Sequence, residues 1–409
     1  MLSAGSQGMS VDDAVTLRAD REDFIETGEV TEVPFVAFPH NADFEFDVHR
    51  PYIDRVNLEC SCGGTMVRVP YVFDCWFESG SMPYAQFHYP FENKELFEKN
   101  FPADFIGEGV DQTRGWFFSL LVLSVGLFEK APFRNVAVNG MILAEDGQKM
   151  SKRLKNYPDP WDILNKYGAD AIRYYLLASP VVRAEGVALS ERGIDEVVKK
   201  HIARTQNVLS FYEMYGGKGD VAQGVSTNVL DQWILARLAQ LAEDMTKGFD
   251  AYEIDRAVKP LALFIDDLST WYLRRSRDRF KSDDAIDRAH AIATTRTVIL
   301  ELAKLLAPAM PFLAEHLYQR IGGEKESVHL DTWPSLSVID EEIVADMAEV
   351  RRTVSIALEA RVKAGMKVRQ PLGKLTIKNQ ALKGKIALLA LIEDEVNVKE
   401  VGFDTALAE

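Results

Sequence analysis

Residues 108–117 of this 409-residue chain read EGVDQTRGWF and stand between two apolar segments. Residues 103–107 are typical of a short buried strand, and residues 112–128 are typical of an apolar helix that Asp111 is placed to cap. The backbone N–H groups at such a strand–helix turn can bind a phosphate, and Gly109 lets a ligand approach the backbone closely. The pattern therefore predicts a nucleotide-binding turn, with a capped core helix as the alternative.

A second motif, KMSKR at residues 149–153, follows a turn at residues 145–147 that closes a predicted strand over residues 135–143. Two lysines and a serine on a short loop can clamp phosphate, because lysine carries its charge on a flexible stem. A lysine–phosphate contact that tightens as negative charge develops in the transition state accelerates the reaction. A solvated basic loop is the alternative. Two strands with a helix between them predict half of a doubly wound parallel sheet, whose ligands sit at the carboxyl ends of the strands.

Both motifs resemble those of isoleucyl-tRNA synthetases, which are class I aminoacyl-tRNA synthetases, and a third block at residues 73–86 resembles the same family. The KMSKR motif ends in Arg153, where most family members have serine. From spacing alone, Trp76 is read as a plain core residue. The resemblance instead implies the following site residues: for catalysis, Lys149, Ser151 and Lys152; for ATP, Met150 and Lys152; for the aminoacyl-adenylate, Glu108, Gly109, Asp111 and Gln112; and for the amino-acid pocket, Trp76 and Trp116.

Residues 186–335 show helical periodicity and predict an antiparallel bundle of long helices. One predicted helix, residues 254–281, ends in the arginine-rich string WYLRRSRDRF, in which Arg275 and Arg279 are spaced to share a face. Arginines near aromatic residues suit an RNA backbone and unstacked bases. The segment resembles the family's anticodon-binding domain, which implies tRNA contacts from Arg274, Arg275, Arg277 and Arg279. The alternative is a salt-bridged face with Asp266, Asp267 and Asp278.

The patterns and the resemblance together predict four regions. These are the trailing edge of an inserted editing domain (1–50), the C-terminal half of a Rossmann-type α/β catalytic domain (51–185), an all-α anticodon-binding helical bundle (186–335) and a small C-terminal α/β region (336–409). Class I synthetases also need an H-x-G-H motif opposite the lysine loop, and this sequence contains none. We therefore expect a C-terminal fragment that is inactive alone and needs an N-terminal half as its partner.

The reaction implied by the resemblance is ATP-dependent activation of L-isoleucine and its transfer to tRNA-Ile. Mg²⁺ would accompany ATP, and no fixed protein metal site is expected. One alternative is a non-catalytic RNA-binding remnant of such a synthetase. Another is a different Rossmann-type nucleotidyl transferase, against which the specific segment at residues 108–117 argues.

Composition is compatible with these expectations. The net charge is −15, but residues 1–60 alone hold 13 acidic and 4 basic residues, so the acidity is local and a basic RNA-binding face remains possible. Cys60, Cys62 and Cys75 do not form a disulfide framework, and their C-x-C spacing favours ordinary thiols over zinc. No apolar run is long enough for a membrane span and no secretory signal is visible, so the cytoplasm is expected.

Overall fold

The computed structural model describes residues 39–43, 45–56, 58–151, 153, 156–216, 224–336 and 339–406. The chain divides into two units, Met1–Glu78 and Ser79–Glu409, and each is described by itself. Most of the predicted editing-domain edge lies outside the described residues. The predicted region boundaries after residues 50, 185 and 335 remain predictions.

The first unit contains a small antiparallel hairpin. Strand β1 (Leu58–Glu59) pairs with β2 (Thr65–Met66), and the N–H of Cys60 donates to the carbonyl of Gly64 at 2.7 Å to close the turn between them. A 3-10 turn precedes the hairpin at Ile53–Arg55. Helix α2 (Cys75–Gly80) begins at the end of this unit.

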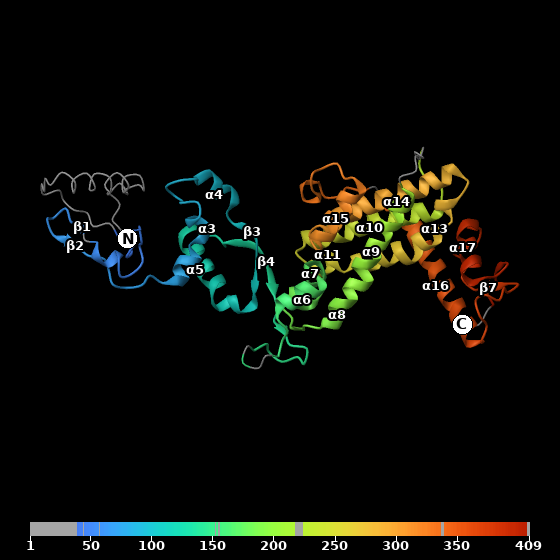
Figure 1. Cartoon of the computed structure of the whole chain (residues 1–409), viewed down its shortest axis with the longest axis horizontal. Coiled ribbons are helices and arrows are strands. Elements are labelled where there is room, and N and C mark those ends of the chain that lie inside the picture. Colours follow the sequence, from blue (N-terminus) through green and yellow to red (C-terminus); the bar gives the residue numbers. More distant parts are fainter. Residues whose placement is uncertain are drawn as a thin grey trace. The chain divides into compact units, whose positions relative to one another are not determined.

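Two parallel strands joined by a crossover helix form the α/β part of the second unit. Strand β3 (Ala103–Gly109) pairs with β4 (Phe133–Asn139), and α5 (Trp116–Phe128) connects them (Figure 1). The predicted strand–helix–strand half of a parallel sheet is therefore confirmed. Two short helices precede it, α3 (Met82–Ala85) and α4 (Lys94–Asn100).

The chain leaves this sheet at Gly140. Its N–H donates to the carbonyl of Val181 at 2.6 Å, and a Cβ at this position would overlap the backbone of Glu185. A separate strand, β5 (Ile142–Leu143), then pairs in parallel with β6 (Val187–Ala188). The prediction of one unbroken strand was wrong, because a distant segment of the chain replaces β3 as the pairing partner beyond Gly140.

The sequence after the lysine motif predicts helices over residues 161–167 and 169–178, and both are confirmed as α6 (Pro160–Tyr167) and α7 (Ala169–Leu177). Asp159 caps α6, because its Oδ1 accepts the N–H of Trp161 at 2.8 Å. Gly168, with a φ of +80°, ends α6 in a conformation that glycine adopts without steric cost. A 3-10 turn, Pro180–Arg183, follows α7.

The next part of the second unit is helical, as predicted. Its helices are α8 (Glu191–Val197), α9 (Ala203–Tyr215), α10 (Val229–Asp250), α11 (Ile254–Val258), α12 (Pro260–Asp266), α13 (Arg274–Ser276), α14 (Ala285–Leu306) and α15 (Pro311–Ile321). The two longest of them are α10 and α14, with 22 residues each. π-Helical turns Val198–Ile202 and Asp267–Leu273 join α8 to α9 and α12 to α13. The main core lies among these helices, where Trp233, Tyr272 and Tyr318 are fully buried.

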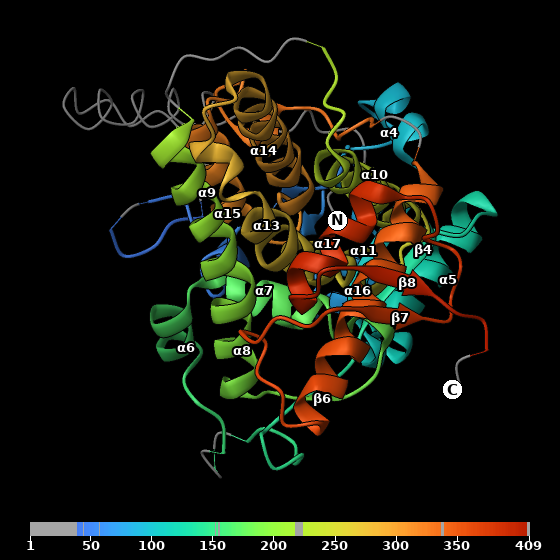
Figure 2. The same ribbon diagram turned by 90° about the vertical axis from the view of Figure 1, so that its right-hand side faces the viewer.

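The C-terminal part combines helices with a small parallel sheet. Its elements are α16 (Glu341–Lys363), β7 (Leu375–Ile377), α17 (Ile386–Val396) and β8 (Val401–Phe403). Strand β7 pairs in parallel with β8, and the four elements lie together in Figure 2. Asp340 caps α16 by accepting the N–H of Ile343 at 3.1 Å.

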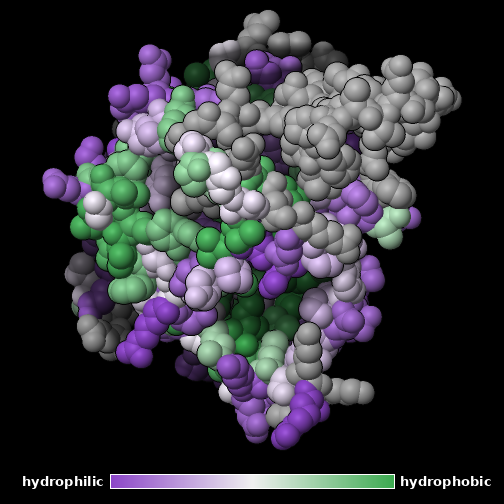
Figure 3. All heavy atoms as spheres, turned by 90° about the vertical axis from the view of Figure 1, so that its left-hand side faces the viewer, coloured by the Kyte–Doolittle hydropathy of each residue, from purple (hydrophilic) through white to green (hydrophobic). Residues whose placement is uncertain are grey.

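Helix α5 is apolar on nearly every side, yet much of it is exposed. Five of its side chains are between 46% and 61% exposed: Phe118, Leu121, Val122, Val125 and Leu127. A helix that is hydrophobic all round is normally buried. Hydrophobic side chains reach the surface in several places on the face drawn in Figure 3. Helix α5 therefore presents an apolar face that the described residues of the second unit leave uncovered.

Candidate functional site

Glu108 and Gly109 end strand β3 at the carboxyl edge of the parallel pair. Glu108 is exposed and lies opposite Val138 of β4, and Gly109 lies opposite Asn139. Ligands of open α/β sheets bind at this edge. The predicted place of the segment in the sheet is therefore confirmed, and its contacts with an adenylate stay predictions.

The turn between β3 and α5 contains an extra 3-10 helix, Val110–Arg114, and α5 begins only at Trp116. Gln112 rather than Asp111 meets this start, because its Oε1 accepts the N–H of Trp116 at 3.1 Å. The Nε2 of Gln112 donates to Oδ2 of Asp111 at 3.4 Å. The predicted cap by Asp111 was wrong, since the 3-10 turn separates that residue from the helix start.

Asp111 instead lies against Gly109. A Cβ at residue 109 would stand 2.5 Å from Oδ1 of Asp111, so a larger residue would displace that carboxylate. The side chain of Asp111 is exposed, and that of Glu108 is exposed on the neighbouring strand end. Two carboxylates and the amide of Gln112 thus offer acceptors for ammonium and hydroxyl groups of a ligand at this edge.

The two predicted pocket tryptophans belong to different units. The Nε1 of Trp116 donates to the carbonyl of Ser79 at 2.9 Å, which fixes the ring at the start of α5. Trp76 lies in the first unit on α2, where its backbone N–H donates to Oδ1 of Asp74 at 2.7 Å. Its side chain is 49% exposed, so the interpretation of Trp76 as a plain core residue was wrong.

The lysine motif leaves β5 through a tight turn. Gly147, with a φ of +79°, donates its N–H to the carbonyl of Ala144 at 2.8 Å. Lys149 then pairs back with Leu143 in an isolated antiparallel bridge. The turn therefore delivers an exposed Lys149 side chain from a fixed backbone.

Asn156 holds the other side of this loop. Its Oδ1 accepts the N–H of Ser151 at 2.9 Å, and its Nδ2 donates to the carbonyl of Lys149 at 3.2 Å. One amide thereby satisfies a donor and an acceptor of residues 149–151. This role of Asn156 was not predicted, although its amide type and its position five residues after Ser151 are visible in the sequence.

The second lysine of the motif, Lys152, lies outside the described residues, as do Leu154 and Lys155. Met150 and Ser151 are half-buried, whereas Lys149 and Arg153 are exposed. The predicted phosphate clamp stays a prediction, and the structure describes only its Lys149 side and the backbone that carries this residue.

Arg279, one of the predicted tRNA contacts, lies in a buried charge cluster. Its guanidinium donates to both carboxylate oxygens of Asp231 at 2.8 and 2.7 Å and to Asp287 at distances between 2.7 and 3.0 Å. Asp231 is fully buried and also accepts from the hydroxyls of Tyr272 at 2.8 Å and Ser226 at 2.6 Å. Burial lowers the pKa of Arg279, but its hydrogen bonds to the carboxylates outweigh burial and raise that pKa above its ordinary value.

The other arginines of the segment have different surroundings. Arg275 is nearly buried and donates to Asp394 and, at 2.8 Å, to Glu395 of α17. Arg274 is 46% exposed and pairs with Glu395 at 2.8 Å. Arg277 is exposed, and the structure describes no ion pair for it among the described residues.

Two expectations about this segment change. Arg275 and Arg279 do not share a face, because Arg275 reaches α17 while Arg279 reaches α10 and α14. Ion pairs do occur, but Asp266 and Asp267 are occupied by other arginines: Arg204, Arg237 and Arg351. The tRNA contacts themselves stay predictions.

Within the described ranges, no group of three or more His, Cys, Asp or Glu side chains is placed to hold a metal ion. The three cysteines are free. No helix in the described part of the chain has the length and apolar character that crossing a bilayer requires.

Two family models match the sequence. The model for class I tRNA synthetases (I, L, M and V) matches residues 17–188, and the model for the anticodon-binding domain of tRNA ligases matches residues 231–377. The isoleucine–tRNA ligase of Protochlamydia amoebophila is 45% identical over 371 residues, which are 88% of this chain and 36% of that protein. That of Chlamydia pneumoniae is 46% identical over 374 residues, which are 87% and 35%. The chain thus spans about a third of the length of these relatives.

Solved structures resemble the fold at lower identity. LeuRS of Agrobacterium radiobacter, in a ternary complex with tRNA and LeuAMS, is 21% identical with a TM-score of 0.54, over 70% of this chain and 36% of that one. Methionyl-tRNA synthetase of Mycobacterium tuberculosis, in complex with methionyl-adenylate, is 24% identical with a TM-score of 0.51, over 61% and 51%. These likenesses bear on the fold alone.

The two matched domains follow each other in the order that the structure shows, with the α/β unit and its lysine loop first and the helical bundle second. Together with relatives that are 45% identical over most of its residues, they show that this chain combines a class I tRNA synthetase domain with the anticodon-binding domain of tRNA ligases, and that its sequence is similar to isoleucine–tRNA ligases.

Proposed function

We propose that this chain supplies the lysine loop, the adenylate-binding segment and the tRNA-binding bundle of an isoleucine-activating enzyme. The reaction is ATP-dependent formation of isoleucyl-adenylate, followed by transfer of isoleucine to tRNA-Ile. The 45% identity to isoleucine–tRNA ligases over 88% of the chain carries the proposal. The position of residues 108–112 at the carboxyl edge of the parallel pair supports it.

In this proposal the lysine loop binds the triphosphate of ATP. Lys149 offers an exposed ammonium on a backbone held by Asn156, and Lys152 supplies the second charge of the motif. These cations accelerate the reaction if they bind the transition state, in which charge develops on the reacting phosphate, more tightly than the ground state. Mg²⁺ accompanies ATP as a counterion of its phosphates.

The segment after β3 binds the adenylate. Glu108 and Asp111 are exposed carboxylates that suit the ammonium of the amino acid and the ribose hydroxyls, and Gln112 adds an amide. Gly109 keeps the backbone accessible beside Asp111. Trp76 and Trp116 are assigned to the aliphatic side chain of isoleucine, which an aromatic wall suits because both surfaces are apolar.

A polypeptide that carries the H-x-G-H motif completes the site. Two features of the described chain suit such a partner: β3 has one edge that pairs with no other described strand, and α5 exposes an apolar face. A two-strand parallel sheet is unusual alone, since parallel sheets are normally covered on both faces. We assign the free edge of β3 and the exposed face of α5 to that partner.

The tRNA surface is proposed to lie at the end of α13. Arg277 and Arg274 are its candidate contacts, because their side chains reach solvent. Arg279 and Arg275 support that surface from beneath through their carboxylate partners.

Isoleucine-dependent ATP–pyrophosphate exchange tests this function. The chain alone is expected to show none, and exchange is expected once a polypeptide carrying the H-x-G-H half is added. Exchange that also vanishes in a Lys149→Ala, Lys152→Ala double variant would assign the activity to this loop. Absence of exchange in the mixture, with tRNA binding retained, would overturn the catalytic role and leave an RNA-binding remnant.

A further inference from the structure

Asp170, near the start of α7, caps a helix of the bundle. Its Oδ1 accepts the N–H of Phe312 at 3.3 Å, and its Oδ2 accepts the N–H of Leu313 at 2.6 Å. Helix α15 receives no side-chain cap from its own N-cap residue, Met310. The carboxylate of Asp170, only 6% exposed, thus satisfies N–H groups that every helix start leaves unpaired.

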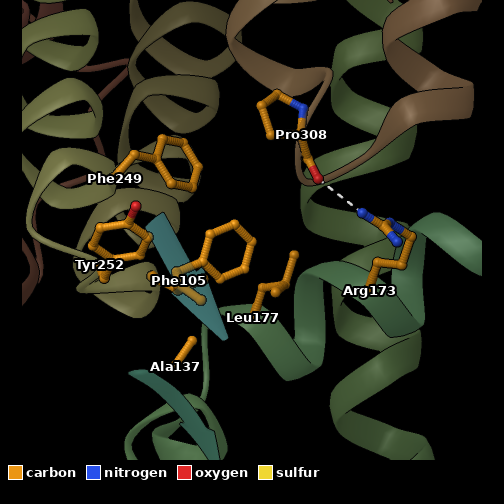
Figure 4. A pocket seen from close by; sticks show the side chains of 8 residues that line it. Phe105, Ala137, Arg173, Leu177, Phe249, Tyr252 and Pro308 are labelled. Atoms are coloured by element: carbon orange, nitrogen blue, oxygen red, sulfur yellow. Dashed lines mark hydrogen bonds between the residues drawn. The ribbon is translucent and has the colours of Figure 1, made fainter. Parts of the chain in front are cut away.

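Arg173, one turn further along α7, binds the end of the preceding helix. Its Nη2 donates to the carbonyl of Pro308 at 2.8 Å (Figure 4). Its Nε donates to the carbonyl of Ala309 at 3.2 Å. These carbonyls lie between the end of α14 and the start of α15. The anionic Asp170 lies at the start of α15, and the cationic Arg173 lies at the end of α14. Both placements match the helix dipoles, and exchanging the two charges would oppose them.

A second ionic contact joins the same regions. Arg183, at the end of the 3-10 turn after α7, pairs with Oδ2 of Asp255 on α11 at 2.7 Å. Asp255 is fully buried and also pairs with Lys259 at 2.7 Å. The α/β part of the second unit is therefore attached to the bundle through two separate sets of charged groups.

Apolar contacts also join these regions. Ala171 and Tyr174 of α7 are buried in the same core as the bundle helices, and the ring centroids of Phe105 of β3 and Tyr252, which follows α10, lie 5.5 Å apart. A cavity of about 270 Å³, lined in part by Phe105, Tyr252 and Arg173, remains beside these contacts (Figure 4). The charged contacts of α7 therefore add a directional constraint to an attachment that apolar packing also stabilises.

The lysine loop is connected to α7 on both sides. On its entry side, Gly140 donates its N–H to the carbonyl of Val181, and Ala184 donates its N–H to the carbonyl of Val138 at 3.0 Å. On its exit side, the loop is held by Asn156 and continues into α6, which only Gly168 separates from α7. A displacement of α7 would therefore move both ends of the loop.

We propose that Asp170 and Arg173 are positioning residues that fix the lysine loop relative to the bundle by holding the corner between α14 and α15. They contact no substrate and act through α7 and residues 180–184. The inference rests on the proposed function only in assigning ATP binding to the lysine loop. The coupling between α7 and that loop follows from the contacts within this chain.

Hydrogen exchange of the full chain, followed by mass spectrometry of its peptides, tests the link. The variant Asp170→Asn removes the charge and one acceptor with little change in volume. We expect about tenfold faster exchange at residues 307–313 and, in the same variant, at residues 140–151, because a charge-assisted hydrogen bond is lost. The middle of α10 reports global opening and should not change.

Glu213→Gln is the matched control. It removes the 2.6 Å ion pair between Glu213 and Arg320, which lies at the end of α15 opposite to the one that Asp170 contacts. Its exchange at residues 140–151 should equal that of the unaltered chain. Arg173→Lys keeps the charge and should accelerate the same two segments as Asp170→Asn, to a smaller extent.

Two results would overturn the proposal. In one, residues 307–313 exchange faster while residues 140–151 do not. In the other, all segments, including α10, accelerate equally, as a purely structural role predicts. The measurement needs neither ATP nor isoleucine, so it stands or falls separately from pyrophosphate exchange.

Discussion

Replacing Arg279 with methionine is expected to destabilise the bundle rather than to act first on RNA. Asp231 is fully buried, and the substitution removes both hydrogen bonds that its oxygens receive from the guanidinium. Breaking a buried pair from one side costs roughly 3–5 kcal/mol, because an uncompensated charge remains. The hydroxyls of Tyr272 and Ser226 still donate to Asp231, so we expect a loss near the lower limit, about 3 kcal/mol.

Urea unfolding followed by circular dichroism measures this change as a lower midpoint at an unchanged slope. Arg277→Met is the matched control, since its side chain is exposed and its substitution should change stability by less than about 0.5 kcal/mol. In the double variant Asp231→Asn, Arg279→Met, the loss of unfolding free energy should be smaller than the sum of the losses in the two single variants, because neither partner is left buried alone. A loss below about 1 kcal/mol for Arg279→Met, together with weaker tRNA binding, would refute this reasoning and restore Arg279 as an RNA contact.

Three further predictions concern other positions. Arg277→Ala should lower the affinity for tRNA and reduce the slope of log K against log salt by about one, as filter binding at several salt concentrations would show; an unchanged slope would remove Arg277 from the interface. The hydrogen bond from Arg279 holds the pKa of Asp287 below its ordinary value, so its stabilisation is present above about pH 4 and is lost as pH falls through the folded-state pKa. Urea midpoints of the chain and of Asp287→Asn should therefore differ at pH 7 and approach each other as the pH falls below about 4, and a constant difference would contradict this. Gly140→Ala should cost roughly 1–3 kcal/mol in thermal unfolding, because its Cβ meets the backbone of Glu185; unchanged stability would show that the two segments are further apart.

Local sequence signals predicted most elements of the second unit. They predict helices over residues 161–167, 169–178, 229–249 and 285–307. Helices α6, α7, α10 and α14 begin and end within one residue of these limits, because caps such as Asp159 and periodic apolar positions are local properties. The same holds for the strand–helix–strand order around residues 108–117. Where a distant segment intervenes, as at Gly140, the local prediction failed.

The candidate site divides in the same way. The strings at residues 108–117 and 149–153 pointed to the family, since a motif is a property of consecutive residues, and the site roles that the resemblance implies for them stay predictions. The roles of Asn156, Asp170 and Arg173 were not predicted. Each depends on which backbone groups a side chain meets after folding, and for Asp170 those groups lie more than 140 residues away.

The sequence by itself determined the class of fold, the order of the α/β unit and the bundle, and the family. These follow from residue periodicity, caps and short motifs, which act within a few residues of one another. Only the tertiary structure decided which charged groups pair. Arginines of one short segment stand side by side in the sequence, yet Arg279 lies in a buried cluster with Asp231 while Arg277 remains exposed. The physical reason is that desolvating a charge is costly, so a partner must be brought from elsewhere in the fold, and sequence spacing does not specify that partner.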